Sequence, residues 1–113
     1  MSAPHDAPTA AELLESVREW LERDVLGAVE GRLQFHTRVA VNVIDIVLRE
    51  MQLGQEQGET HRRVLAALGH DDDASLAAAV RRGDFDANLA ELLGHLRPVI
   101  EDKVKVANPR YLR

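Results

Sequence analysis

The segment RLQFHTRVAVNVIDIVLREMQL, residues 32–53, decides the fold. Its polar residues recur every three or four positions and fall on one narrow stripe of a helix, whereas almost all other positions are apolar. A helix that is apolar around most of its girth must be covered by other elements on several sides. The segment therefore predicts a central, largely buried second helix in an all-α protein.

Patterns on either side of this segment predict the rest of a bundle of four to five helices. Leucine and valine at helical spacing follow Thr9–Glu12, which has the spacing of a capping box, and predict a first helix over residues 10–26. Glycines alternating with glutamines and a glutamate indicate a linker over residues 54–58. Further helices are expected over residues 59–68 and 74–82 and from residue 86 onward.

Glycine, aspartate and proline mark the expected ends of these helices. Gly69 is suited to a C-terminal cap, and Gly83 ends the following helical pattern. The run Asp71–Asp73 is suited to capping the start of that helix. Pro98 lies inside the last pattern and predicts either a kink or a restart of the helix after Arg97.

Length and composition fit one globular domain. We expect a flexible tail over residues 1–8, which hold two prolines and no periodicity, and one helical domain over residues 9–113. The longest apolar run, residues 39–48, is far shorter than the ~20 residues that span a bilayer, so no membrane association is expected. The absence of cysteine excludes thiolate chemistry and disulfides, and with no signal-like start it indicates a cytoplasmic protein.

The charge pattern and the known motifs argue against several function classes. A net charge of −5, with basic and acidic residues interleaved, does not favour binding of nucleic acid. The five histidines lack the Glu-x-x-His spacing of carboxylate-bridged metal sites, so no metal is expected. No phosphate-binding glycine loop or nucleophile elbow is present. We therefore assign no catalytic residue and no cofactor.

The polar stripe of residues 32–53 is the best candidate for a functional site. It combines two guanidinium groups, which recognise carboxylates and phosphates through paired donors, with an amide and a carboxylate. The same residues also fit a solvated helix face with a favourable Asp45–Arg49 pair at i,i+4. Both interpretations stay open. The candidate ligand- or partner-binding residues are His36, Arg38, Asn42, Asp45 and Arg49.

The C-terminal segment is expected to be ordered and packed, and the protein to self-associate. Asn108-Pro109 predicts the end of the last helix, and Tyr111 then offers a ring to bury and a hydroxyl to satisfy. The other helices are too short to cover the apolar girth of residues 32–53 completely. Because uncovered apolar faces often pair symmetrically, we expect a homodimer.

Three segments resemble a small uncharacterised bacterial family, a domain of unknown function. They are Phe35–Asn42 followed by Arg49-Glu50, the ending Val106–Leu112, and the opening Glu15–Arg32. Gly27 stands where proline would be expected in such proteins. The resemblance implies genes next to aminoglycoside-phosphotransferase-like kinases and acyl-CoA dehydrogenases, but no activity that transfers to this chain.

Two hypotheses of function follow. The first is a non-enzymatic accessory or interaction protein, which the resemblance would make a partner of a phosphotransferase-like kinase in acyl-CoA-related metabolism. The second is a small helical bundle that binds an anionic small molecule at Arg38, Asn42 and Arg49.

Overall fold

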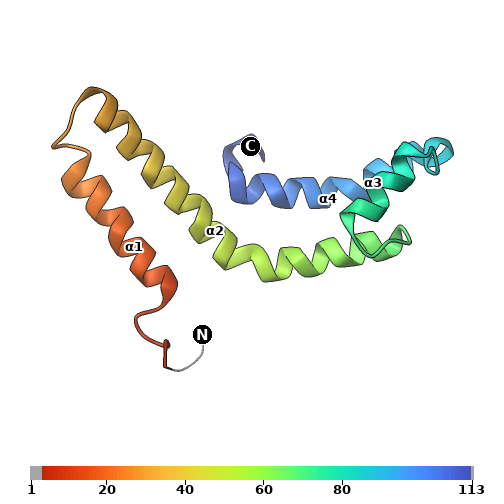
Figure 1. The fold of residues 1–113 in the computed structure, drawn as a ribbon, viewed down its shortest axis with the longest axis horizontal. Coiled ribbons are helices and arrows are strands. Elements are labelled where there is room, and N and C mark those ends of the chain that lie inside the picture. Colours follow the sequence, from red (N-terminus) through yellow and green to blue (C-terminus); the bar gives the residue numbers. More distant parts are fainter. Residues whose placement is uncertain (1–3, 113) are drawn as a thin grey trace. The chain divides into compact units, whose positions relative to one another are not determined.

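A computed structural model describes residues 4–112 of the chain. Within this range the chain forms four α-helices and no β-strand, so the all-α prediction is confirmed (Figure 1). Residues 4–8 form turns and bends with exposed side chains, whereas residues 1–3 of the expected tail lie outside the described range. The helices are α1 (Ala10–Trp20), continued by a π-helical turn (Leu21–Val25), α2 (Gly31–Ala67), α3 (Asp73–Arg81) and α4 (Leu89–Ala107). Short 3-10 turns cover Asp86–Asn88 and Pro109–Leu112.

The helices form two compact units, Met1–Gln52 and Leu53–Arg113, here called unit 1 and unit 2. Helix α2 contributes its first part to unit 1 and its last part to unit 2.

Unit 1 is a helical hairpin in which α1 runs beside the first part of α2 (Figure 1). The predicted capping box starts α1: the Thr9 hydroxyl accepts from the Glu12 amide at 3.1 Å, and the Glu12 carboxylate accepts from the Thr9 amide at 3.0 Å. The hydrogen bond from the Thr9 amide to the Glu12 carboxylate, and to a smaller extent the Thr9 side chain, hold the pKa of Glu12 below its ordinary value. Gly31, at a φ of 62°, allows the chain to turn into α2. The Gln34 side chain donates to two carbonyls of the connecting turn.

The predicted linker over residues 54–58 is wrong, because α2 runs unbroken through it from Gly31 to Ala67. Glutamine and glutamate are good helix formers, and a glycine in a helix costs only about 1 kcal/mol relative to alanine. Tertiary contact offsets this cost, since the Gln57 side chain donates to the Asp102 carbonyl of α4 at 3.1 Å. The segment is therefore a structural part of unit 2.

Gly58→Ala is expected to stabilise the protein by about 0.5–1 kcal/mol, because alanine loses less backbone freedom in a helix. Its Cβ would lie 3.8 Å from the Arg62 guanidinium, an ordinary contact. Gly69→Ala is the matched control and should destabilise the protein, since Gly69 has a φ of 82°. Thermal unfolding of both variants checks this. A Gly58→Ala variant with unchanged stability would instead favour a linker over residues 54–58.

The prediction of a largely buried second helix is also wrong. Thr37, Val41 and Leu65 are the buried residues of α2, whereas Leu33 and Phe35 are 64% and 61% exposed. The reason is geometric: in the described part of unit 1, residues 4–52, α1 is the only helix that packs beside α2, and one helix covers one side of another. Much of the apolar girth of α2 is left exposed.

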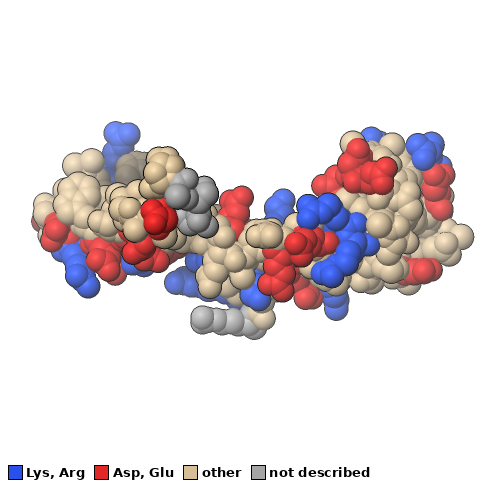
Figure 2. Space-filling view, turned by 90° about the horizontal axis from the view of Figure 1, so that it is seen from below, with Lys and Arg blue, Asp and Glu red and all other residues tan. Residues whose placement is uncertain are grey.

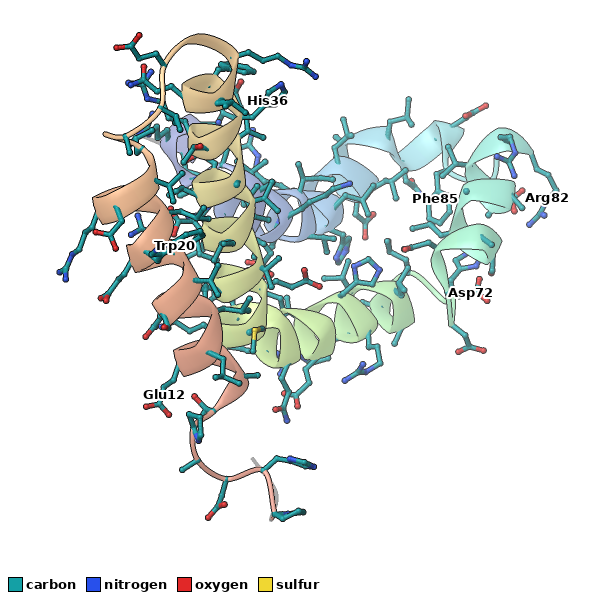
Figure 3. All side chains as sticks on the ribbon, turned by 60° about the vertical axis from the view of Figure 1, so that its left-hand side comes forward. Glu12, Trp20, His36, Asp72, Arg82 and Phe85 are labelled. Carbon is teal, nitrogen blue, oxygen red and sulfur yellow. The ribbon has the colours of Figure 1, made fainter. Side chains whose placement is uncertain are left out.

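Unit 2 contains a core cluster of buried leucines. Leu65 of α2, Leu76 of α3 and Leu92 of α4 form its centre, and Phe85 (labelled in Figure 3) packs against them. The prediction that the run Asp71–Asp73 caps the following helix is confirmed here. The Asp72 carboxylate accepts from the Ser75 amide at 2.7 Å and caps α3.

Gly69 and Gly83 both end helices in the left-handed conformation, with φ of 82° and 86°. In each case two amides that follow the helix bond back to its last turn. His70 donates to Leu65 at the end of α2, and Asp84 donates to Ala79 at the end of α3. This is the bonding of a Schellman motif.

Helix α4 passes through Pro98 without interruption, so the helix does not restart after Arg97. Proline removes one backbone donor and strains the preceding turn. Apolar residues on both sides of Pro98, Leu92 and Val99 among them, keep helical spacing and remain at least partly covered. This packing accounts for the continuity of the helix.

Candidate functional site

The predicted stripe residue Asp45 pairs with α1. The Arg18 guanidinium donates to both Asp45 oxygens, at 2.5 Å from Nε and 3.4 Å from the terminal nitrogen, and it also contacts Glu22 at 3.1 Å. The hydrogen bond to Asp45 raises the pKa of Arg18. We call Arg18, Glu22 and Asp45 the polar edge of the hairpin. Asp45 thus has a structural role in holding α1 to α2.

A double-mutant cycle of Arg18→Ala and Asp45→Ala is expected to give a coupling free energy of about 1 kcal/mol. The pair is forked and about 70% buried, with side chains 30% and 28% exposed, which places it at the upper end of surface ion pairs. Urea unfolding of the four proteins measures the coupling. Arg18→Lys should retain only part of it, because an ammonium cannot form the fork. Purely additive effects would show that the pair does not hold the hairpin.

The other stripe residues differ in their surroundings. His36 accepts from Arg32 at 3.4 Å and lies edge-on to the Phe35 ring, with centroids 5.5 Å apart. Arg38 and Asn42 are exposed, and neither side chain forms a hydrogen bond or ion pair with any part of residues 4–112. Arg49 is half-buried. The stripe therefore presents Arg38 and Asn42 outward, next to a carboxylate that is already paired.

On the opposite side of the hairpin lies an exposed apolar surface, which we call the apolar edge. At 100° per residue, its members on each helix fall within about 60° of one another, and each lies at least about 100° away from Arg18 on α1 or from Asp45 on α2. Their exposed fractions range from 37% for Val47 to 64% for Leu33, and Trp20 (labelled in Figure 3) is 56% exposed. The apolar edge consists of Leu13, Val17 and Trp20 on α1 and Leu33, Val47 and Met51 on α2.

Unit 2 has a hollow of about 250 Å³ between the end of α2, the start of α3 and α4. On its rim His61 Nε2 lies 2.7 Å from the Asp73 carboxylate, and Lys103 stands on α4. Its apolar lining consists of Val64, Leu65, Leu96, Val99 and Ile100. Sequence analysis missed this site because its three polar residues lie 12 and 30 positions apart and match no motif.

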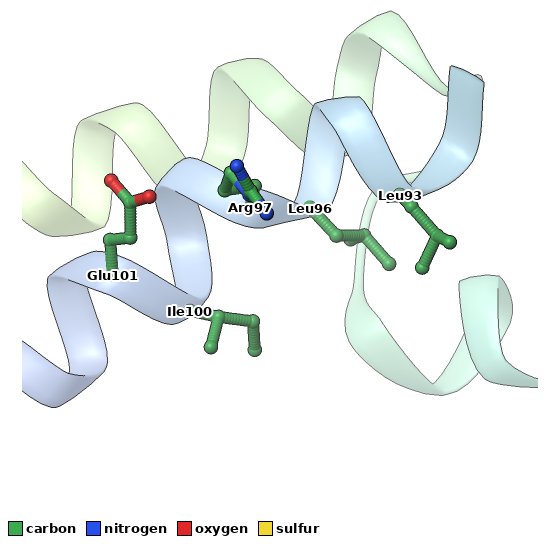
Figure 4. Close-up of a pocket in the computed structure, with 5 residues that line it drawn as sticks. All are labelled: Leu93, Leu96, Arg97, Ile100 and Glu101. Atoms are coloured by element: carbon green, nitrogen blue, oxygen red, sulfur yellow. The ribbon is translucent and has the colours of Figure 1, made fainter. Parts of the chain in front are cut away.

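A second hollow, of about 470 Å³, lies along α4 (Figure 4). Leu93 and Ile100, which are 64% and 57% exposed, form its apolar part, and Arg97 and Glu101 flank it. Charged groups are mixed over the face that Figure 2 shows, where Lys and Arg alternate with Asp and Glu and neither sign forms a continuous field.

The C-terminal segment is regular but its aromatic ring is not buried. Asn108 follows α4, and its side chain accepts from the Arg110 amide at 3.3 Å while Pro109–Leu112 form a 3-10 turn. Tyr111 is 79% exposed, so the expected packing of its ring is wrong. Local hydrogen bonds, including Tyr111 to the Asn108 carbonyl at 3.1 Å, form the turn without help from the ring.

Residues 4–112 contain neither a candidate metal site nor a candidate membrane-spanning helix. No group of three or more histidines and acidic residues is placed to hold a metal ion. None of the helices in this range is both long enough and apolar enough to cross a membrane.

Comparison with protein families gave a match over most of the chain. A family model described as "Domain of unknown function (DUF6285)" matches residues 27–111, which is most of the chain and includes α2, α3 and α4. This finding agrees with the resemblance to an uncharacterised family. The searches of curated proteins and of solved structures returned no match.

Proposed function

Because the chain belongs to the DUF6285 family, a domain of unknown function, we propose a role based on its surfaces: a non-enzymatic accessory protein that acts through protein–protein contacts. The apolar edge of the hairpin is the contact surface in this proposal. The observation that carries it is that six large apolar side chains on two adjacent helices are all substantially exposed.

The size and composition of the apolar edge fit an interface. None of its six residues is charged, and Trp20 and Met51 belong to the types enriched in interface cores. The exposed parts of the six side chains amount to roughly 500 Å² per copy, so pairing two copies would bury about 1,000 Å². That area is the lower limit of a specific interface, and side chains beside the edge would add to it.

A second copy of the chain is the partner that this surface fits best. An apolar patch without charges is complementary to itself, as a two-fold interface requires. Two hairpins packed edge to edge would form a four-helix bundle, in which helices cross at about 20°. Sedimentation equilibrium at tens of micromolar should then give twice the 12.6 kDa of the chain. A species of 12.6 kDa at these concentrations would refute the homodimer.

A phosphotransferase-like kinase is the second proposed partner, and its support is the family resemblance. In this proposal the kinase carries the chemistry of an acyl-CoA-related pathway, and the helical protein docks to it or regulates it. Co-expression with the phosphotransferase-like kinase that the resemblance would place in a neighbouring gene, followed by size-exclusion chromatography, tests the proposal. Elution of the two proteins as one complex is expected, and separate elution at micromolar concentrations would contradict it.

An alternative function is the binding of a small anion at Arg38, Asn42 and Arg49. It is favoured by the exposure of Arg38 and Asn42, whose side chains are not engaged elsewhere in residues 4–112. Binding of inorganic phosphate, followed by amide chemical shifts, should weaken about tenfold in Arg38→Gln, because a guanidinium contributes charge-assisted bonds. Unchanged shifts on phosphate addition would remove this alternative.

A further inference from the structure

We propose that the hollow of unit 2 binds a short aliphatic carboxylate, with its chain in the apolar interior and its carboxylate at Lys103. This site is independent of the apolar edge, which belongs to unit 1. All eight lining residues lie within unit 2, so one compact unit forms the whole site.

The interior of the hollow selects an apolar group. Val64 and Leu65 from α2 face Leu96, Val99 and Ile100 from α4, and none of these side chains carries a polar atom. A polar group placed among them would lose its bonds to water without replacement. Since a cavity of about 150 Å³ accommodates benzene, a hollow of about 250 Å³ has room for a chain of roughly eight carbons.

The rim of the hollow selects the charge of the ligand. Asp73 contributes the carboxylate of the lining, and its Oδ1 is already bonded to His61 at 2.7 Å. Lys103 is exposed and forms no ion pair or side-chain hydrogen bond with residues 4–112. The end of a ligand whose alkyl chain leaves the hollow past Lys103 would therefore lie next to the Lys103 ammonium group. This group carries a positive charge and three hydrogen-bond donors. A carboxylate matches this group, and an amine would be repelled by it.

The hollow is also well placed to bind without rearrangement. The His61–Asp73 pair links α2 to the start of α3, and Gln57 links α2 to α4 through the Asp102 carbonyl. Leu65 is 4% exposed and belongs to the core of the unit. The walls are thus fixed by contacts that do not need a ligand, as is usual for small-molecule sites.

Titration of the ¹⁵N-labelled full chain with octanoate tests this proposal. Saturable amide shifts are expected in residues 61–65 and 96–103, with a Kd of about 1 mM or below. Octylamine, which has the same chain and the opposite charge, should bind at least about tenfold more weakly. Lys103→Gln should weaken octanoate binding about tenfold, and Lys105→Gln, on the same helix but outside the hollow, should leave it unchanged.

Val99→Trp, which fills the hollow, should abolish the shifts while circular dichroism remains helical. If this variant does not fold, the two lysine variants still decide. Equal binding of octanoate and octylamine, or equal effects of the two lysine variants, would overturn the proposal. So would shifts that map to the apolar edge of unit 1, or the absence of saturable shifts up to ~10 mM ligand.

Discussion

Replacing Leu92 by alanine should lower the free energy of unfolding by about 2–4 kcal/mol. Leu92 is 4% exposed and packs in the centre of unit 2 with Leu65 and Leu76. The variant loses the transfer free energy of the removed methyl groups and leaves a cavity among neighbours that cannot fully close it. Urea unfolding followed by circular dichroism measures the change.

Leu93→Ala is the matched control, because it removes the same atoms one position further along the same helix. Leu93 is 64% exposed, so its truncation should change stability by less than about 0.5 kcal/mol. Similar losses for both variants would mean that the exposed face of α4 is also packed in solution. Small losses for both would mean that the three leucines do not form the core of unit 2.

Val17→Glu is expected to weaken self-association by at least about 100-fold. Val17 lies in the middle of the α1 row of the apolar edge, so pairing would bury the new carboxylate without a partner. Burial of an unpaired charge costs several kcal/mol, and about 2.7 kcal/mol corresponds to a factor of 100 in Kd. Because Val17 is 47% exposed in the single chain, the hairpin itself should tolerate the change. Sedimentation over a range of concentrations gives the Kd.

Asn42→Glu adds the same charge to the exposed polar stripe of α2, at a position about 180° around the helix from Leu33 and Met51. Its Kd should equal that of the unmodified chain. A loss of association in both variants would indicate a general effect of charge and would contradict the assignment of the interface to the apolar edge.

Local patterns made the helices predictable, because their causes lie within a few residues. The Thr9–Glu12 capping box, the Asp72 cap and the left-handed Gly69 were all expected, and each acts within one helical turn. The glycines of residues 54–58 predict a linker, because glycine is a poor helix former, but these residues belong to α2. The contact that stabilises the helix there, Gln57 to Asp102, spans 45 positions and leaves no local pattern.

Which apolar faces of the helices are buried against other elements of the same chain could not be predicted in the same way. A girth of apolar residues on α2 shows that a surface needs cover, but it does not show whether that cover comes from the same chain. The candidate site had the same difficulty. Asp45 was assigned to a binding stripe, and its partner Arg18 lies 27 positions away on another helix. His61, Asp73 and Lys103 are brought together only by the packing of three helices.

Fluorescence of the single tryptophan, recorded from micromolar to hundreds of micromolar protein, tests the central claim most directly. Trp20 is 56% exposed and lies on the apolar edge, so it reports both association and its location. Pairing through this edge predicts an emission maximum that shifts to shorter wavelength as concentration rises, in step with the increase in sedimenting mass. An emission maximum that stays constant while the mass doubles would place the interface elsewhere and contradict the account.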